Sequence, residues 1–339
     1  MGPETFQLLL QKCVKLLRLC LLMLFIVVSI LCLLFFTQFN SKQAVVIVKA
    51  IDANELWHPA KFTDGLTENE RKLFIYGKEL IIHTSIYLGP KGKVMQNTNG
   101  MNCQNCHLEA GTKIWGNNYG GVYANYPKYR ARSGKIEDIF KRINDCIERS
   151  LNGKAISIES KEMQAIKIYI ESIGKNVEKG IKPKGTGIFE LPFLDRAIDP
   201  QKGKELFQAK CISCHQLNGR GKWDENKNEY IYPPLWGPNS YNIGAGLFRM
   251  SRFAGFIKYN MPLGASIDLP QLTDEEAWDL AAYVNSQPRP SKDLSADWPK
   301  LNEKPFDHPF KPYLDTFTEE QHKFGPFEAI VIAIKKSKK

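Results

Sequence analysis

The sequence predicts a mainly α-helical protein, with one N-terminal membrane-spanning helix followed by two small helical domains in tandem. Three observations lead to this prediction. A long uncharged apolar run occurs once, near the N-terminus. A Cys-x-x-Cys-His pattern occurs twice, and amphipathic helical periodicity is found around both copies. The length of 339 residues agrees with two domains of about 150 residues each.

The composition excludes several classes of protein. Hydrophobic residues make up 43% and charged residues 24%, which is ordinary for a globular chain and excludes global disorder and a collagen-like repeat. The mean hydropathy of −0.32 and the single apolar run exclude a polytopic membrane protein. The formal charge of +10 favours small anions or acidic protein partners and does not by itself indicate nucleic acid.

The apolar run extends from Leu19 to Phe36, which is just long enough to cross a bilayer as a helix. Lys12, Lys15 and Arg18 precede it, which predicts a cytoplasmic N-terminus and a chain exported to the periplasmic side. We therefore assign residues 1–42 to a cytoplasmic stub and a single-pass membrane anchor. The alternative is a cleaved signal peptide with release into the periplasm. The length of the run and the lack of a small-residue cleavage site after it favour the anchor.

Four cysteines form two copies of one pattern. The first copy is Cys103-Gln-Asn-Cys106-His107, and the second, far along the chain, is Cys211-Ile-Ser-Cys214-His215. Cys-x-x-Cys-His is the attachment pattern of c-type haem, in which two thiols bind the vinyl groups and the histidine ligates the iron. A zinc knuckle needs further Cys or His ligands nearby, and a thioredoxin-like site does not require the histidine. The sequence therefore predicts two covalently bound haem c groups, whose four propionates would bring the charge to about +6.

Each copy of the pattern lies between predicted helices. In the first domain, residues 43–182, the stretch 69–80 forms the leading helix, and Met163, Ile166, Ile170 and Ile173 mark the closing helix. In the second domain, residues 200–290, the leading helix covers 201–208 and another helix lies around 247–259.

The last helix of the second domain has its own start signal. Thr273 and Glu276 form a capping box before an apolar stripe. This order of elements matches two class I cytochrome c-like domains in tandem. The stretch from Gly174 to Pro200 carries four Gly, four Lys and three Pro, and within it we assign residues 183–199 to the linker. Residues 291–339 are predicted to form a C-terminal arm that packs on both domains.

The second domain offers two methionines as sixth iron ligand. Met250 lies within a predicted helix, where packing explains it. Met261 follows that helix and precedes a proline, where a ligand loop is expected. A His/Met pair is the usual arrangement of an electron-carrying cytochrome c. We therefore predict Met261 as the distal ligand.

The first domain has no equivalent methionine between its haem pattern and its closing helix. What it has there is Cys146. Cys146 falls at the edge of an apolar stripe formed by Ile136, Ile139, Phe140, Ile143 and Ile147. Arg142, Cys146 and Ser150 form one ridge at i, i+4 and i+8. Either Cys146 is a small buried core residue, or it is a thiolate that binds haem iron and lowers its potential.

The segment Arg132 to Gly153, with its Arg-Ile-x-x-Cys-x-x-Arg-Ser-x-Asn-Gly core, resembles the thiosulfate dehydrogenase (TsdA) family of dihaem cytochromes. The arm resembles it too, from Phe306 to Gly325-Pro326-Phe327, and the resemblance covers roughly residues 55 to 335. The resemblance implies an oxidoreductase that couples two thiosulfates into tetrathionate with release of two electrons, or runs the reverse. It further implies a catalytic first haem and a second haem that relays electrons.

The resemblance also implies roles for individual residues. Cys146 would be the distal ligand of the catalytic haem and the site of a transient sulfur adduct. Arg132, Arg142 and Ser150 would line the substrate site. One departure is Asn260 before Met261, where some family members have lysine, so a lysine-to-methionine ligand exchange there is not expected.

Two further hypotheses remain open at this point. The chain is alternatively a non-enzymatic, membrane-anchored electron carrier of a respiratory chain, with Cys146 in the core. An open first haem would instead indicate peroxidase-like chemistry. The expected electron partner is a soluble cytochrome c or a membrane redox complex, and no nucleic acid is expected.

Overall fold

The computed structural model describes residues 2–39, 54–60 and 65–337. The chain divides into two compact units, one ending at Ile47 and one covering Val48 to Lys339. The predicted start of the first domain, at residue 43, lies outside the described residues. The domain boundaries predicted above therefore remain predictions.

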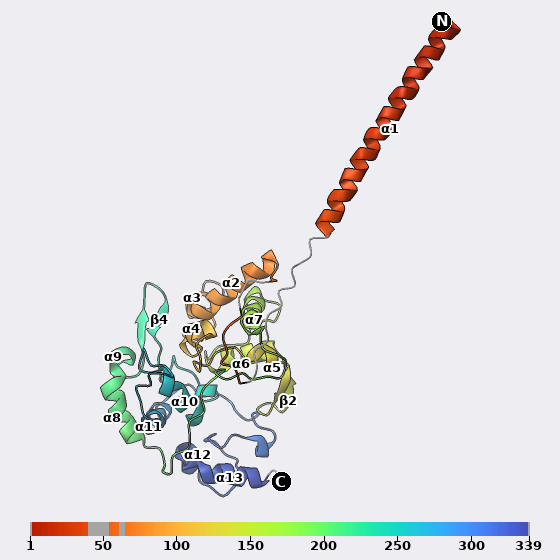
Figure 1. Ribbon diagram of the computed structural model, residues 1–339. Helices are drawn as coiled ribbons and strands as arrows, with labels where there is room; N and C mark the ends of the chain where they lie inside the picture. The colour runs from red at the N-terminus through yellow and green to blue at the C-terminus, as the bar shows by residue number, and fades with distance from the viewer. Residues whose placement is uncertain (1, 40–53, 61–64, 338–339) are drawn as a thin grey trace. The chain divides into compact units, whose positions relative to one another are not determined.

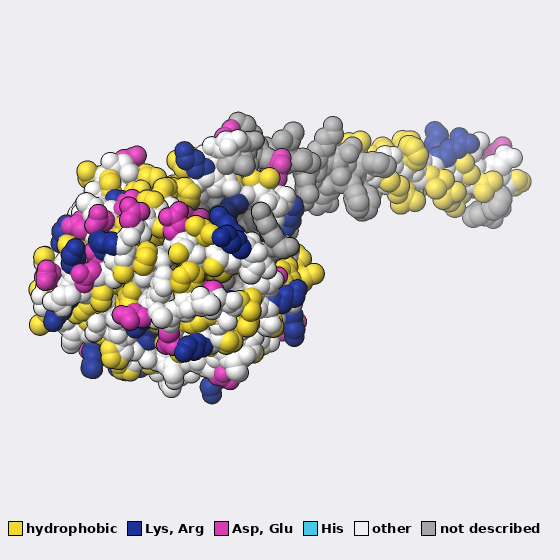
Figure 2. Space-filling model, turned by 90° about the horizontal axis from the view of Figure 1, so that it is seen from below, with side chains coloured by type: hydrophobic (Ala, Val, Ile, Leu, Met, Phe, Trp, Pro, Cys, Tyr) yellow, Lys and Arg dark blue, Asp and Glu magenta, His cyan; other side chains and the backbone are white. Residues whose placement is uncertain are grey.

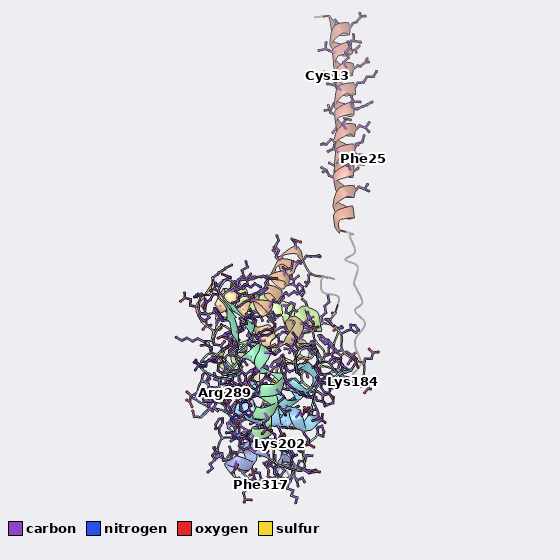
Figure 3. The ribbon with its side chains drawn as sticks, turned by 90° about the vertical axis from the view of Figure 1, so that its left-hand side faces the viewer. Cys13, Phe25, Lys184, Lys202, Arg289 and Phe317 are labelled. Carbon is purple, nitrogen blue, oxygen red and sulfur yellow. The ribbon has the colours of Figure 1, made fainter. Side chains whose placement is uncertain are left out.

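The N-terminal unit contains one helix, α1 (Pro3–Phe39), which includes the predicted run from Leu19 to Phe36. Its stretch from Gln7 to Leu33 is long and apolar enough to cross a membrane. Figure 2 shows the helix as largely apolar, with basic side chains gathered near its N-terminal end. The side chains of Cys13 and Phe25 project from the helix, and both are exposed in the protein (Figure 3).

The second unit is mainly helical (Figure 1). In its first half, the elements are α2 (Glu68–Ile82), α3 (Thr84–Leu88), η1 (Cys103–Asn105), α4 (Leu108–Gly111), α5 (Val122–Asn125), β1 (Lys128–Arg130), β2 (Lys135–Glu137), α6 (Ile139–Arg149) and α7 (Lys161–Gly174). In its second half, they are α8 (Pro200–Lys210), α9 (Ile212–His215), β3 (Lys222–Asp224), β4 (Glu229–Tyr232), η2 (Gly246–Phe248), α10 (Met250–Asn260) and α11 (Asp274–Asn285). The last residues form η3 (Leu301–Glu303), α12 (Glu319–Phe324) and α13 (Phe327–Ser337).

The predicted leading and closing helices are confirmed in both halves. Helices α2 and α7 bury Phe74, Leu80, Met163 and Tyr169 in one core. Helices α8 and α11 bury Phe207, Trp278 and Leu280 in a second core. The predicted capping box of α11 is present, with the Thr273 hydroxyl accepting from the Glu276 amide and the Glu276 carboxylate accepting from the Thr273 amide. These helices therefore form where the local sequence specifies them.

A glycine allows the leading helix to lie against the closing helix in each half. A β-carbon at Gly77 of α2 would be 2.1 Å from the Ala165 carbonyl oxygen of α7. A β-carbon at Gly203 of α8 would be 1.9 Å from the Asp279 carbonyl oxygen of α11. In Figure 1, α2 lies beside α7 and α8 beside α11. Neither contact leaves room for a side chain.

We expect Gly203→Ala to destabilise the protein, although alanine favours a helix over glycine by about 1 kcal/mol. Separating two packed helices costs about 1–3 kcal/mol, so the net change should lower the melting temperature by a few degrees. Gly246→Ala is the matched control, because a β-carbon there meets nothing within 4 Å. Equal melting temperatures for the two variants in a thermal scan would show that the helix crossing tolerates the methyl group.

The helix that carries Cys146 starts later than the apolar stripe predicts. Asp138 caps α6 by accepting from the Lys141 amide. The three residues before it form β2, which pairs antiparallel with β1. Ile136 lies on this strand and is 75% exposed, so its assignment to the helix stripe was wrong. Ile139, Ile143 and Ile147 are buried as predicted.

The two halves and the arm make contacts with one another. The β3–β4 hairpin lies on the first half, where Glu229 contacts His83 Nδ1 at 2.9 Å and accepts from the Asn102 amide at 3.1 Å. The arm contributes Phe327 and Ile330 to the second core. Its Asp297 forms a two-pronged ion pair with Arg149 of α6 at 2.7 and 2.8 Å. The region predicted to be an arm therefore packs on both halves.

Candidate active site

The first haem pattern and the Cys146 helix face the same cavity. Its wall includes Cys103, Cys106 and His107 from η1 and the adjoining turn, and Arg142, Cys146 and Ser150 from α6 and its C-terminal cap. The remaining wall is mostly apolar, with Ile81, Leu88, Ile143 and Ile166 among its residues. The cavity thus places two thiols, one imidazole and one further sulfur in an apolar enclosure, which fits a covalently attached haem.

The environment of His107 suits an iron ligand. Its Nδ1 hydrogen-bonds to the Asn117 carbonyl oxygen, which can only accept, so Nδ1 carries the proton. The other nitrogen, Nε2, keeps its lone pair for a metal. Burial lowers the pKa of His107 to about 4, so the ring is neutral at pH 7. Tyr119 stacks on the imidazole with ring centres 4.4 Å apart.

Burial also affects the two cysteines of the pattern. Burial raises the pKa of Cys103 to about 11 and that of Cys106 to about 12, so both thiols are protonated at neutral pH. Within residues 2–39, 54–60 and 65–337, no group of three or more Cys, His, Asp or Glu side chains is arranged to hold a metal ion.

Helix α6 holds Arg142 and Cys146 one turn apart, as the ridge pattern predicts. Arg142 Nη1 lies 3.1 Å from Cys146 Sγ. The charge of Cys146 raises the pKa of the Arg142 guanidinium. Ser150 caps the helix, with its amide donating to the Cys146 carbonyl oxygen at 2.8 Å. The structure therefore brings Arg142, Cys146 and Ser150 together on one cavity wall.

Arg132 lies apart from these three residues. Among the described residues it is not one of those that line this cavity. Its Nη1 donates to the Gly244 carbonyl oxygen at 2.6 Å, and its guanidinium lies 5.4 Å from the Trp298 ring centre. Burial lowers its pKa to about 10. Arg132 thus connects the first half to the second half and the arm, and a place for it in the substrate site stays a prediction.

Three cationic residues on the cavity wall were not predicted. Lys128 and Arg130 lie on β1, and Lys182 lies after α7. The signal in the sequence is the alternation of Tyr126, Lys128 and Arg130, which places their side chains on one face of an extended segment. Nothing local in the sequence indicates that Lys182 joins them.

The second haem pattern faces a separate cavity with a similar design. Cys211, Cys214, His215 and Met261 line it. His215 Nδ1 donates to the Pro233 carbonyl oxygen at 2.9 Å, and burial lowers its pKa. This cavity measures about 130 Å³, against about 250 Å³ for the first.

The two methionine candidates have different surroundings. Met261 lies on the cavity wall directly after α10, whereas Met250 is 2% exposed in the core at the start of α10. Lys258 is held elsewhere, because its Nζ donates to the Leu272 carbonyl oxygen at 2.7 Å and pairs with Asp274 at 2.8 Å. The amide of Asn260 donates to the Phe256 and Trp115 carbonyl oxygens. This arrangement favours Met261 over Met250.

The two cavities share part of a wall. Cys106 lines both, and its neighbours Met101 and Asn105 line the second cavity. A cofactor attached in the first cavity would therefore adjoin the second cavity through the first haem pattern itself. No sequence signal predicts this adjacency, because the two patterns lie far apart along the chain.

Comparison with known protein families agrees with this description. Residues 93–178 match the family described as SoxA/TsdA, cytochrome c domain, and residues 200–288 match the family described as cytochrome c. Both predicted cytochrome c domains are thereby confirmed, and with them the two c-type haems.

The most similar relatives include two thiosulfate dehydrogenases. The protein from Allochromatium vinosum is 41% identical over 196 residues, covering 57% of this chain and 71% of the relative. The protein from Psychrobacter arcticus is 38% identical over 204 residues, covering 59% of this chain and 60% of the relative. A solved thiosulfate dehydrogenase, TsdBA from Marichromatium purpuratum, superposes with a TM-score of 0.63 at 30% identity, covering 70% of this chain and half of that chain. The chain therefore belongs to the thiosulfate dehydrogenase family of dihaem c-type cytochromes.

Proposed function

We propose that this protein interconverts thiosulfate and tetrathionate in the cavity of the first domain. The observation that carries the proposal is the Cys146 thiol beside Arg142 in the cavity that also holds Cys103, Cys106 and His107. A core cysteine of a simple electron carrier needs neither a guanidinium beside it nor the additional cationic residues on the cavity wall. The names of the relatives support the same substrate.

The reaction makes one S–S bond and releases two electrons. Two thiosulfate dianions join through their sulfane sulfurs to give one tetrathionate dianion, so no atom is lost and no proton is required. Two dianions repel each other at contact distance, and nearby guanidinium and ammonium groups offset that repulsion. Arg142 stands where it can do this for a substrate at Cys146.

Cys146 is proposed both to bind the catalytic haem iron and to carry the sulfur adduct. A thiolate sulfur that takes up one thiosulfate forms a cysteinyl thiosulfonate and gives up two electrons. A second thiosulfate then attacks the sulfane sulfur of this adduct, which releases tetrathionate and restores the thiolate. Ser150, on the same wall, is proposed to donate a hydrogen bond to the oxyanion end of the substrate.

Three further residues are proposed to hold the haem irons. His107 would bind the iron of the first haem, and His215 and Met261 would bind that of the second. When bound, the two haems supply two one-electron acceptors, which match a two-electron reaction. Cys106 lines both cavities, so groups held in the two cavities would lie on either side of this residue.

The proposal also covers the location of the protein and its electron partner. We propose that α1 anchors the protein in the cytoplasmic membrane with its basic end inside, following the charge rule for single spans. The catalytic body then lies on the periplasmic side, where haem c is attached. The electron partner is proposed to be a soluble cytochrome c or a membrane redox complex.

Rapid mixing tests the activity directly. The protein is expressed with a haem-maturation system, and thiosulfate is added to its oxidised form and tetrathionate to its reduced form. We expect the haem bands to report reduction in the first case, oxidation in the second, or both. If neither oxyanion changes the spectrum on the time scale of turnover, the protein is an electron carrier.

The electron paramagnetic resonance spectrum of the oxidised protein tests the ligand assignment separately. We expect one low-spin signal typical of His/thiolate coordination and one typical of His/Met coordination. A high-spin first haem would contradict Cys146 ligation, whatever the activity.

A further inference from the structure

The otherwise largely apolar wall of the first cavity carries four cationic side chains. Lys128, Arg130, Arg142 and Lys182 line it, and the described residues of this wall include no aspartate or glutamate. The second cavity has a single charged residue on its wall, Lys210. Both cavities fit the same cofactor, so binding of the cofactor does not explain the additional positive charge in the first cavity. That charge therefore serves a function that is specific to the first cavity.

The local structure explains how two of these cations, Lys128 and Arg130, and the nearby Tyr126 come to line the same cavity. Tyr126, Lys128 and Arg130 alternate along an extended segment, so their side chains share the face toward the cavity. Tyr129, between them, is 43% exposed and donates to Glu303 of the arm at 2.6 Å. Pairing with β2 fixes this orientation.

Three donors on this wall have neither a hydrogen-bond acceptor nor an ion-pair partner among the described residues. The Tyr126 hydroxyl is buried in a residue that is 8% exposed, and no described group accepts its hydrogen bond. Within the described residues, neither Lys128 nor Lys182 has a carboxylate within ion-pair distance, whereas Arg130 has Glu137 at 3.8 Å. Partial burial and the charges of Arg130, Arg142 and Lys182 lower the pKa of Lys128. Both lysines are exposed, so leaving them unpaired costs little, whereas the buried Tyr126 hydroxyl without an acceptor is costly and indicates a ligand at this wall.

The cofactor does not account for all of these groups. Glu137 lies 3.8 Å from Arg130 and Cys146 lies beside Arg142, so Lys128 and Lys182 are the two wall charges without an acidic partner among the described residues. The second cavity fits the same cofactor with only Lys210 on its wall, so the propionates of a haem c do not by themselves require two wall lysines. Two positive charges match one dianion. Since Arg142 already lies beside Cys146, the two lysines and the tyrosine are the groups left to hold it.

We infer that Tyr126, Lys128 and Lys182 form a second anion subsite, which holds the sulfonate group of one thiosulfate unit while Arg142 and Ser150 hold the other. This inference rests on the proposed function. Two separate subsites let both dianions occupy one cavity, because each is paired with its own cations. The lysines and the tyrosine are thus specificity-determining residues for the oxyanion ends and do not bind the reacting sulfurs.

Steady-state kinetics with matched lysine variants tests the subsite. Lys128→Gln and Lys182→Gln each remove one charge from the wall, and Tyr126→Phe removes the hydroxyl. Lys135→Gln is the control, since Lys135 is exposed on the neighbouring strand β2 and is not a wall residue. We expect each lysine variant to raise the KM for thiosulfate about tenfold or more with little change in kcat. Lys128→Arg should restore most of the affinity, and Lys135→Gln should match wild type.

Two readouts separate a substrate subsite from cofactor binding. Calorimetric titration of the oxidised holoprotein with sodium sulfate should show binding that weakens about tenfold in Lys128→Gln and Lys182→Gln. The midpoint potential of the first haem and its pH dependence should stay those of wild type. If the variants instead change that pH dependence and leave KM and sulfate binding unaltered, the lysines pair with the propionates and the subsite is refuted.

The same measurements distinguish this inference from the proposed function. If wild type converts neither thiosulfate nor tetrathionate but binds sulfate through Lys128 and Lys182, the proposed function fails and the anion subsite stands. If wild type is active and the lysine variants match it in KM, kcat and sulfate binding, the subsite fails and the proposed function stands.

Discussion

Replacement of Cys146 by alanine is expected to abolish thiosulfate-dependent haem reduction and tetrathionate-dependent haem oxidation. The expected loss in kcat is about 10³-fold or more, because the variant lacks the only sulfur proposed to carry the adduct. Alanine keeps the helix propensity of α6, so the helix itself should persist. The Arg142 side chain, which lies 3.1 Å from the thiol, loses a partner but stays within the cavity.

The measurement is rapid mixing of the oxidised variant with thiosulfate, followed at the haem bands, together with the resonance spectrum of the oxidised state. Cys20→Ala is the thiol control, because Cys20 lies on α1 and not on the cavity wall. We expect the His/thiolate signal to disappear in Cys146→Ala and to persist in Cys20→Ala. Wild-type turnover by Cys146→Ala would assign Cys146 to packing and leave electron transfer at the haem edge as the explanation of any activity.

Replacement of Met261 by leucine is expected to uncouple the second haem from the first. A thioether ligand favours the reduced iron, so its loss should lower the potential of the second haem by on the order of 100 mV, within the range of about 0.8 V that axial ligands span. For a one-electron centre, a change of about 59 mV in potential changes the equilibrium constant tenfold. The equilibrium constant for electron transfer from the first haem to the second should therefore fall at least tenfold.

Met250→Leu is the matched control for this experiment. Both substitutions conserve side-chain volume, and such exchanges cost less than about 1.5 kcal/mol. Met250 is the other methionine near α10 but belongs to the core. Redox titration and rapid mixing should show a lowered second potential and a slow second phase in Met261→Leu only. The opposite pattern, with the change in Met250→Leu, would make Met250 the ligand.

Several properties of this protein could be predicted from short stretches of sequence. The two attachment patterns, the capping box of α11 and the ridge of Arg142, Cys146 and Ser150 depend on residues within a few positions of one another. Capping and the 3.6-residue period act locally, so the sequence specifies them without reference to the rest of the chain. The family resemblance also rested on such a stretch, and comparison with known proteins confirmed it.

The predicted start of the helix that carries Cys146 was wrong, although it rested on a local pattern. Ile136 fits the helical period of the stripe, but Asp138 caps the helix three residues before Lys141 and leaves Ile136 on a strand. The capping residue sets the start of the helix, because its side chain accepts a hydrogen bond from a backbone amide in the first turn. The apolar periodicity contains no information about this hydrogen bond.

What the sequence by itself determined is therefore the chemistry available: two haem attachment sites, a candidate thiolate ligand beside an arginine, and one apolar helix. What only the tertiary structure decided is which distant side chains surround that chemistry. It brought Lys182 next to Lys128 and Tyr126, placed Cys106 between two cavities, and turned Arg132 toward Gly244. These arrangements depend on long-range packing of helices and strands, whose outcome no local pattern encodes.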